Sequence, residues 1–464
     1  MREIGIPIVR IQKIKISNFK NVENGTIEFK NNIFENDIQS KAELLGIYGQ
    51  NGSGKTALVD ASLFFKMLLS RLPLPEDLFN YINIKSESSK LEFELYVKIE
   101  ENLFLITYEV KFKKNENEAI ISYEKLAYSK FSNDGWSNKS TIIEYDINSE
   151  DLFTPKYRYK KVLNDNDNII NLKVIQKLSM QKNTSFIFND ETSNIINTAL
   201  NNEKTLIDII DVLTYFARCN LFVIPNNHNA IISMNILMPF SFRLEQEKTI
   251  ASGDMAVGLD GISLIDNKEF KILNNIIKQM NVVLSIIIPS LTVELYKYGE
   301  QLDEKGNIKQ KIELLSVRGE SKIPIRYESE GIKKIISILS ALIAMYNNKS
   351  ICMVVDELDS GIYEFLLGEI LKVIDNGGKG QLIFTSHNLR PLEILNKESV
   401  YFTTTNPENR YIHFSQVKPT HNLRSLYLRS INLGGQKENL YNETDELEIR
   451  RAFRLAGDER KYGI

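Results

Sequence analysis

Residues 49–56 have the composition and spacing of a loop that binds phosphate groups. They read Gly-Gln-Asn-Gly-Ser-Gly-Lys-Thr and fit the pattern G-x-x-x-x-G-K-[ST]. Glycines let successive backbone N–H groups curl around phosphate oxygens, and the N-terminus of a following helix favours the same negative charge. Lys55 would neutralise the β- and γ-phosphates of ATP, and the Thr56 hydroxyl would ligate Mg²⁺. The expected nucleotide-binding residues are Gly49, Asn51, Gly52, Ser53, Gly54, Lys55 and Thr56.

Two acidic residues follow an apolar run later in the chain. Residues 351–355 read Ile-Cys-Met-Val-Val, which is typical of a buried strand, and Asp356 and Glu357 come next. Such a strand end could place one carboxylate toward Mg²⁺ and the other toward the γ-phosphate. We expect Asp356 to act through the metal and Glu357 to polarise the attacking water as a general base, which is worth about 10²–10⁴ in rate. An Asp-Glu turn after a core strand is common, so this interpretation depends on the phosphate loop.

Two further segments could act on the same phosphates. Ser329-Glu330-Gly331 opens an amphipathic helical pattern and could form a second anion-binding helix end. One nucleotide does not need two such ends, so the pattern favours a head-to-tail dimer in which Lys55 of one subunit and Ser329 of the other enclose each nucleotide. The alternative is a plain N-cap. His387 follows the apolar residues 382–384 and could bond the γ-phosphate, although a lone histidine is more often structural.

The elements that must position these residues alternate between strand and helix. An apolar run at 44–48 precedes a helical pattern at 57–72, and a helix from 332, a strand at 351–355, a helix at 365–374 and a strand at 382–385 follow later. This alternation favours a parallel sheet with crossover helices. Between the two regions, residues 91–131 alternate as antiparallel strands, residues 205–217 and 270–285 have helical patterns, and residues 293–317 suggest a hairpin.

Composition excludes several classes of protein. The 464 residues carry Lys+Arg 57 against Asp+Glu 60, a net charge of −3, so a strongly basic nucleic-acid coat protein is not expected. No run approaches the roughly 20 apolar residues of a membrane span, and the first residues lack a signal-peptide core. We therefore expect a cytoplasmic protein without membrane contact.

In this order, the motifs resemble those of the ABC-type ATPases of the SMC and RecF kind. Residues 49–56 look like the Walker A loop, 329–331 like the signature, 351–357 like Walker B, and Asp359 and His387 like the D-loop and switch histidine. Asn18-Phe19-Lys20 resembles the family start, where a basic residue at the position of Lys20 lies near the nucleotide. The spacing is most similar to the stand-alone bacterial AAA family ATP-binding proteins related to the overcoming-lysogenization-defect group. No glutamine can be assigned to the glutamine loop of the SMC and RecF family.

The resemblance implies an α/β fold: an ABC-type P-loop ATPase head built from both chain ends, with an inserted β-rich and helical lid. The expected domains are 1–75 with Walker A, 76–325 with strands that continue the head and then a mainly helical lid, and 326–464 with the signature, Walker B and tail. The implied function is Mg²⁺-dependent ATP hydrolysis by a homodimer or higher even-numbered oligomer. ATP-gated dimerisation would sense or hold a partner in anti-phage defence with a separate effector protein. The alternative is a repair or recombination protein that acts directly on DNA, so nucleic acid remains a possible partner.

Overall fold

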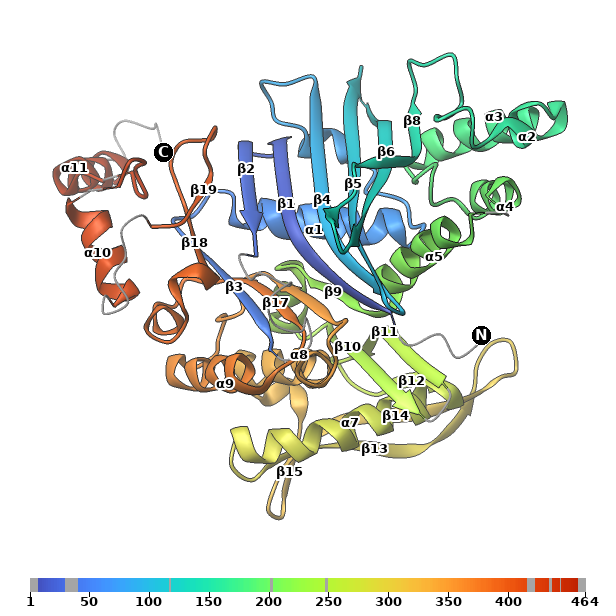
Figure 1. The fold of residues 1–464 in the computed structure, drawn as a ribbon. Coiled ribbons are helices and arrows are strands. Elements are labelled where there is room, and N and C mark those ends of the chain that lie inside the picture. The colour runs from blue at the N-terminus through green and yellow to red at the C-terminus, as the bar shows by residue number, and fades with distance from the viewer. Residues whose placement is uncertain are drawn as a thin grey trace.

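The described part of the protein contains four sheets with helices around them, and the two largest sheets position the site (Figure 1). The structure is a computed structural model that describes residues 7–29, 41–116, 118–200, 203–246, 249–414, 422–433, 436–442 and 444–457. Helix α1 (Lys55–Leu69) lies between the sheets, because its apolar residues share one core with strands of both. One sheet is antiparallel and the other is mainly parallel.

The antiparallel sheet is built from the first part of the chain. Its strands run in the order β2-β1-β4-β5-β6-β7, and β8 pairs with β6. On β4, Leu91, Phe93 and Leu95 are buried, whereas Glu92 and Glu94 between them are half-buried, so one face of the sheet covers the core. The strands are β1 (Ile8–Phe19), β2 (Val22–Glu28), β4 (Ser88–Ile99), β5 (Asn102–Asn115), β6 (Glu118–Ser132), β7 (Gly135–Trp136) and β8 (Ser140–Asp146).

The second sheet joins segments from distant parts of the chain. Its order is β19-β18-β3-β17-β16-β9, and every pair except β18–β19 is parallel. Leu382 lies between Leu44 and Met353 in register, so the strand before the phosphate loop and the strand before the two acids flank a common neighbour. The strands are β3 (Glu43–Tyr48), β9 (Leu221–Ile224), β16 (Cys352–Val355), β17 (Gln381–Thr385), β18 (Val400–Thr403) and β19 (Tyr411–Ile412).

Both faces of this sheet are covered, which explains its unbroken apolar runs. Leu45 and Ile47 of β3 belong to the core that contains α1. Leu44 and Tyr48 belong to the core on the opposite face, together with α8 (Glu330–Asn347) and α9 (Glu364–Gly377). Because parallel strands with helices on both faces have no solvent-facing side, they carry apolar residues at consecutive positions.

A buried polar group links the two sheets. Arg10 of β1 donates to Glu43 Oε2 at 2.6 Å, and the side-chain amide of Gln381 donates to the same oxygen at 2.9 Å. Gln381 also accepts from the Ile11 amide at 2.8 Å and donates to the Ile11 carbonyl at 2.9 Å. The carboxylate of Glu43 is therefore paired, as a buried charge must be. The contacts fix β1 across the N-terminal edges of β3 and β17.

The rest of the chain surrounds this two-sheet unit (Figure 1). Helices follow the antiparallel sheet, and a second group of strands and helices lies beyond α8. The helices are α2 (Lys160–Leu163), α3 (Asn166–Lys182), α4 (Asp190–Ala199), α5 (Lys204–Cys219), α6 (Asn227–Ser233), α7 (Asn267–Ile287), α10 (Leu423–Leu433) and α11 (Glu446–Ala456). The strands are β10 (Leu237–Gln246), β11 (Thr249–Gly258), β12 (Ser263–Asp266), β13 (Leu291–Leu302), β14 (Ile308–Arg318) and β15 (Ser321–Pro324).

The predicted α/β fold with a sheet assembled from both chain ends is confirmed, with one addition. Strand β9, from the middle of the chain, pairs with β16 and forms an edge of the parallel sheet. The expectation of a mainly helical lid holds only up to residue 219, since strands β9 to β15 occupy much of residues 221–324. Four-residue apolar strands such as β9 carry no period that separates them from helix. Of the helices that the structure describes, none has the length and apolar character to span a membrane.

Candidate functional site

The phosphate loop joins the end of β3 to the start of α1. Gly54 precedes the helix with φ 94°, a left-handed conformation that glycine adopts without a Cβ clash. Lys55 Nζ donates to the carbonyls of Gly49 at 2.9 Å and Gln50 at 3.0 Å, so the side chain folds back over its own loop. Burial lowers the pKa of Lys55, and the nearby Asp356, Glu357 and Asp359 oppose that shift. Lys55 therefore lies close enough to these three acids for their charges to favour its protonated form.

The two acids at the end of β16 are positioned by the neighbouring strand β17. Thr385 Oγ1 donates to Asp356 Oδ1 at 2.6 Å and accepts from the Glu357 amide at 2.8 Å. Glu357 has φ 47°, a left-handed conformation that costs a non-glycine residue about 1–3 kcal/mol. Such strain is retained where the surrounding structure over-determines it, which is common at functional sites. The threonine thus holds the carboxylate of Asp356 and the backbone of Glu357 with one hydroxyl group.

One pocket of about 450 Å³ brings most of the predicted residues together. It lies where the carboxyl ends of β3, β16 and β17 meet, which is where open α/β sheets bind ligands. The loop, the two acids and the histidine all reach it. Its lining comprises Lys20, Asn21, Asn51, Gly52, Gly54, Lys55, Thr56, Ala57, Asp356, Glu357 and His387.

Lys20 reaches this pocket from the turn between β1 and β2. Its φ is 52°, and its ammonium group forms an ion pair with Asp60 of α1 and lies 5.0 Å from the centre of the Tyr81 ring. Burial raises the pKa of Asp60, and the pair with Lys20 lowers it in part. Lys20 therefore places a second positive charge at the pocket, and α1 fixes where that charge lies.

His387 lies at the rim of the pocket on the loop that follows β17, and its side chain is exposed. Asp359 holds this loop, because its Oδ2 accepts from the amides of His387 at 3.1 Å and Asn388 at 3.0 Å. The loop after β16 thus carries the acids and also fixes the backbone of the histidine.

Ser329 and Gly331 do not line the pocket of their own chain. Ser329 caps α8 by accepting from the Ile332 amide at 3.4 Å. A Cβ on Gly331 would lie 1.9 Å from the carbonyl oxygen of Gly361, so only glycine permits this contact between α8 and the loop after β16. The predicted second anion-binding end is therefore a helix N-terminus, placed outside the pocket and packed against the loop that holds His387.

Several residues that support the phosphate loop were not found from the sequence. Tyr411 OH donates to the Gly54 carbonyl at 2.7 Å, Thr403 Oγ1 shares a hydrogen bond of 2.5 Å with Ser53 Oγ, and Arg410 donates to the Asn21 carbonyl at 2.6 Å. The Asn21 side chain in turn donates to the Gly52 carbonyl. Thr403 and Tyr411 belong to β18 and β19, and Arg410 directly precedes β19, so no motif near residue 50 could point to any of the three.

The edge strand β9 adds a further group beside the acids. The Asp356 amide donates to the Ile224 carbonyl at 2.9 Å, so the segment after β9 begins at the carboxyl end of β16. Asn229 of that segment accepts a hydrogen bond from the ammonium group of Lys334 on α8. Burial lowers the pKa of Lys334 to about 8, and Asp356, Glu357 and Asp359 oppose the shift. A buried cation thus lies within electrostatic reach of the two acids.

The residues present fit a hard divalent cation such as Mg²⁺. Asp356 is buried, and its Oδ2 has no hydrogen-bond partner among the described residues, which leaves one carboxylate oxygen available as a ligand. Thr56 lines the same pocket with a hydroxyl group. Magnesium is bound in proteins through one or two such oxygens together with water and substrate phosphates.

A family model matches most of the chain. The family described as "AAA domain, putative AbiEii toxin, Type IV TA system" matches residues 44–393, a range that spans both the phosphate loop and the acids after β16. None of the curated proteins compared with the chain matches its sequence.

The solved structures that match this chain do so at low sequence identity and low TM-score. A crystal structure of the SmcHead bound to the C-winged helix domain of ScpA is 11% identical, with a TM-score of 0.40, and the match covers 88% of this chain and 98% of that one. The SMC head domain from Thermotoga maritima is 13% identical, with a TM-score of 0.35 and coverages of 88% and 99%. The recombination mediator protein RecF-ATPrS is 13% identical, with a TM-score of 0.38 and the same coverages.

Proposed function

This chain belongs to the AAA domain family that its residues 44–393 match, and from that membership and the geometry of the pocket we propose that it hydrolyses ATP to ADP and phosphate. The observation that carries the proposal is the meeting of Lys55 and Thr56 with Asp356 and Glu357 around one pocket of about 450 Å³. Two segments 300 residues apart along the chain supply these groups. Each of these groups is suited to one part of phosphoryl transfer, namely binding phosphate, holding a metal ion or activating water.

The residues of the pocket take different roles in this reaction. The amides of residues 49–56 and the N-terminus of α1 bind the phosphates, and Lys55 moves from its loop carbonyls to the β- and γ-phosphates. Glu357 accepts a proton from the attacking water, and His387 bonds the γ-phosphate from the rim. Asp356 and Thr56 hold Mg²⁺, which neutralises charge on the phosphate oxygens when it is bound. Lys20 adds a second positive charge at the pocket.

The second part of the proposal is a dimer that ATP closes. The N-terminus of α8, with Ser329 and Gly331, lies outside the pocket of its own chain, so it is available to the nucleotide of a second copy. A head-to-tail arrangement would let the Ser329 end of each copy cover the Lys55 loop of the other. Hydrolysis would then open the dimer, and nucleotide state would control whether a partner is held.

The biological role that we propose is defence against phage together with a separate effector protein. The description of the family refers to a toxin and a TA system, and this supports a role beside a second protein. A repair or recombination protein that acts on DNA is the competing function. Measuring ATP turnover with and without DNA separates the two, because a strong stimulation by DNA would favour the competing function.

The decisive experiment compares the wild type with Glu357→Gln and Lys55→Ala. The first variant should bind ATP with unchanged affinity, release phosphate about 10²–10⁴-fold more slowly, and accumulate as dimers in the presence of ATP and Mg²⁺. The second should lose ATP affinity, because its loop lacks the cation. Equal turnover in the wild type and Glu357→Gln would remove Glu357 from its role. Mass spectrometry of proteins that co-purify with ATP-bound Glu357→Gln would identify the partner.

A further inference from the structure

Two buried hydroxyl groups contact the phosphate loop from strands β18 and β19. Thr403 Oγ1 of β18 shares a hydrogen bond of 2.5 Å with Ser53 Oγ. Tyr411 OH of β19 donates to the Gly54 carbonyl at 2.7 Å. The two side chains are 0% and 5% exposed, and neither residue is among those that line the nucleotide pocket. Both can therefore act on a nucleotide only through the loop.

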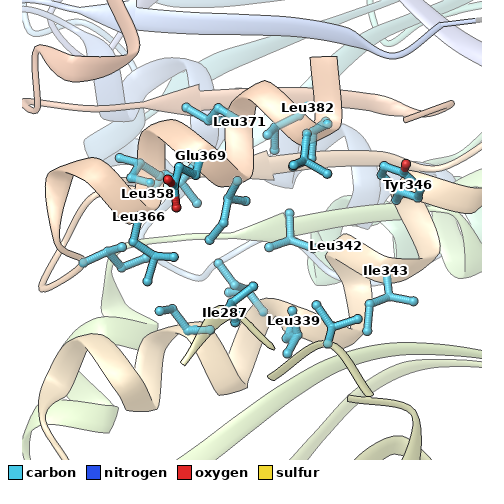
Figure 2. A pocket seen from close by; sticks show the side chains of 18 of the residues that line it. Ile287, Leu339, Leu342, Ile343, Tyr346, Leu358, Leu366, Glu369, Leu371 and Leu382 are labelled. Atoms are coloured by element: carbon cyan, nitrogen blue, oxygen red, sulfur yellow. The ribbon is translucent and has the colours of Figure 1, made fainter. Parts of the chain in front are cut away.

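The two hydroxyl groups belong to one cross-strand pair. Thr403 and Tyr411 are directly opposite each other where β18 and β19 pair antiparallel, and the side chains of opposite residues lie on the same face of a sheet. Tyr401 and Tyr411 belong to the core that contains α1, so this is the face that α1 covers. On the other face, Leu382 and other, mostly apolar side chains surround a pocket of about 510 Å³ between α7, α8 and α9 (Figure 2). The hydroxyl pair thus lies on the face of α1 and of the loop that precedes it.

Strand β18 brings this pair to the loop because it pairs with β3. Phe402 is in register with Tyr48, the last residue of β3, so Thr403 lies beside Gly49, where the loop begins. A Cβ on Gly49 would lie 1.7 Å from Thr403 Oγ1, so only glycine permits this approach. Thr403 also donates to the Tyr48 carbonyl at 3.2 Å. The loop therefore leaves β3 along a strand that the sheet already holds in place.

The contact with Tyr411 fixes the peptide group that joins Gly54 to Lys55. As the residue before α1, Gly54 also offers its carbonyl to the first turn of the helix, and the hydroxyl supplies a second donor. In a trans peptide, the carbonyl of one residue and the amide of the next point in opposite directions. Gly54 and Lys55 line the pocket and Tyr411 does not, so a carbonyl held by Tyr411 keeps the Lys55 amide directed toward the pocket. The bond also polarises the peptide and makes its N–H group a stronger donor.

The loop needs supports that stay in place when a nucleotide binds. In the structure, Lys55 Nζ holds the carbonyls of Gly49 and Gln50. In the proposed reaction this ammonium group moves to the phosphates, so the two carbonyls lose that donor. Ser53 Oγ donates to the Gln50 carbonyl at 2.6 Å and is itself held by Thr403, and these contacts do not involve the lysine. A loop that is held in this way before binding loses less conformational entropy when it takes up phosphate.

We propose that Thr403 and Tyr411 are positioning residues for nucleotide binding, which hold the phosphate loop in its binding conformation before a nucleotide arrives. This inference rests on the proposed function, because it takes the loop to be the site of the nucleotide phosphates. The hydrogen bonds of the pair go to the loop and to Tyr48, not to the acids after β16. The pair therefore acts on the affinity for ATP and ADP alike and leaves the chemical step unchanged.

Two substitutions remove the hydroxyl groups with little change of shape. Tyr411→Phe and Thr403→Val should each weaken the binding of ADP and of ATP about three- to tenfold and by the same factor, measured by isothermal titration calorimetry in EDTA. At saturating ATP and Mg²⁺, kcat should change less than about twofold. Thr403→Ser keeps the hydroxyl group and should bind ADP with nearly the affinity of the wild type. Unchanged ADP affinity in either Tyr411→Phe or Thr403→Val, or a fall in kcat that exceeds the fall in affinity, would overturn the inference.

Tyr401→Phe is the matched control. Tyr401 lies two residues before Thr403 on β18, and its buried hydroxyl group accepts from the Glu28 amide at 2.9 Å. This variant loses the same chemical group as Tyr411→Phe, but the lost contact holds β2 rather than the loop. We expect its melting temperature to fall as in Tyr411→Phe while its ADP affinity stays that of the wild type. An equal loss of ADP affinity in the two variants would mean that the strands act only as general support, which contradicts a positioning role.

ADP binding also separates this inference from the proposed function. A wild type that binds ADP without hydrolysing ATP contradicts only the proposed function. A wild type that hydrolyses ATP while Tyr411→Phe binds ADP normally contradicts only the positioning role. A wild type that binds neither nucleotide contradicts both.

Discussion

The Thr385 hydroxyl donates to the carboxylate of Asp356 at 2.6 Å, and this contact sets the direction of the acid that would hold the metal. The same oxygen accepts from the Glu357 amide at 2.8 Å. A residue on β17 therefore controls both acids that follow β16. The hydrogen bond from the Glu357 amide to Thr385 also helps to hold Glu357 at φ 47°, a conformation that glycine would adopt more readily.

Thr385→Val should lower ATP turnover more than ATP binding. Valine keeps the shape of threonine but leaves both the Asp356 oxygen and the Glu357 amide without this partner, and a buried unpaired group costs about 1–3 kcal/mol. We expect kcat to fall about 10- to 100-fold, while ATP affinity measured without Mg²⁺ stays unchanged. Thr385→Ser is the matched control, because serine keeps the hydroxyl. Equal loss in the valine and serine variants would show that the methyl group, not the hydrogen bonds, matters.

Ser329→Arg should block hydrolysis only where two copies share a site. The arginine would obstruct the surface that meets the partner's nucleotide, so turnover should be lost while a monomer binds ATP normally. Mixing this variant with Lys55→Ala should restore activity, because one site of each mixed dimer then combines an intact Lys55 loop with an intact Ser329 end. Phosphate release from the mixture is the measurement. If each chain formed a complete site alone, mixing would restore nothing.

Lys334→Met should change the pH dependence of stability. Lys334 is 2% exposed, and burial lowers its pKa from 10.5 to about 8 in the folded state. Between these two values the unfolded chain binds more protons than the folded chain, so the stability of the wild type rises with pH across this window. The cost of holding the lysine is complete below pH 8 and disappears as the pH approaches 10.5.

The measurement that checks this effect is the difference in unfolding free energy between the variant and the wild type. The stability of Lys334→Met relative to the wild type should fall by roughly 2–3 kcal/mol between pH 7 and pH 10, since each unit of pKa shift corresponds to about 1.4 kcal/mol. Chemical denaturation at each pH gives both values. Lys271→Met is the control, because Lys271 is exposed on α7 and its loss should give a difference that does not vary with pH. A flat difference for Lys334→Met as well would mean that this lysine stays charged in the folded state up to pH 10.

Much of the site was predictable from short segments of sequence, for a physical reason. A phosphate loop needs its glycines, lysine and threonine within eight consecutive residues, because backbone amides and a helix N-terminus must surround one anion. The strand before Asp356 could be recognised because a strand buried on both faces has to be apolar at every position. These local requirements leave a pattern that one sequence is enough to reveal.

The residues that hold the site in place through long-range contacts leave no comparable pattern in the sequence. Tyr411 holds the Gly54 carbonyl and Arg10 holds Glu43 through contacts that span 357 and 33 residues, and each residue type is common elsewhere in the chain. Strand β9 was assigned to an inserted lid, because Leu221–Ile224 is too short to show a period. Only the register of β9 beside β16 places it at the acids.

The sequence by itself determined which chemical groups the pocket contains: those that could bind phosphate, those that could hold a metal and those that could activate water. The tertiary structure decided how these groups are held, because Thr385, Asp359 and Tyr411 act across strands that only folding brings together. It also decided that the Ser329 end of α8 lies outside the pocket of its own chain. Local spacing encodes groups that share one turn or one strand end, whereas groups joined across a sheet are specified by packing that no short segment contains.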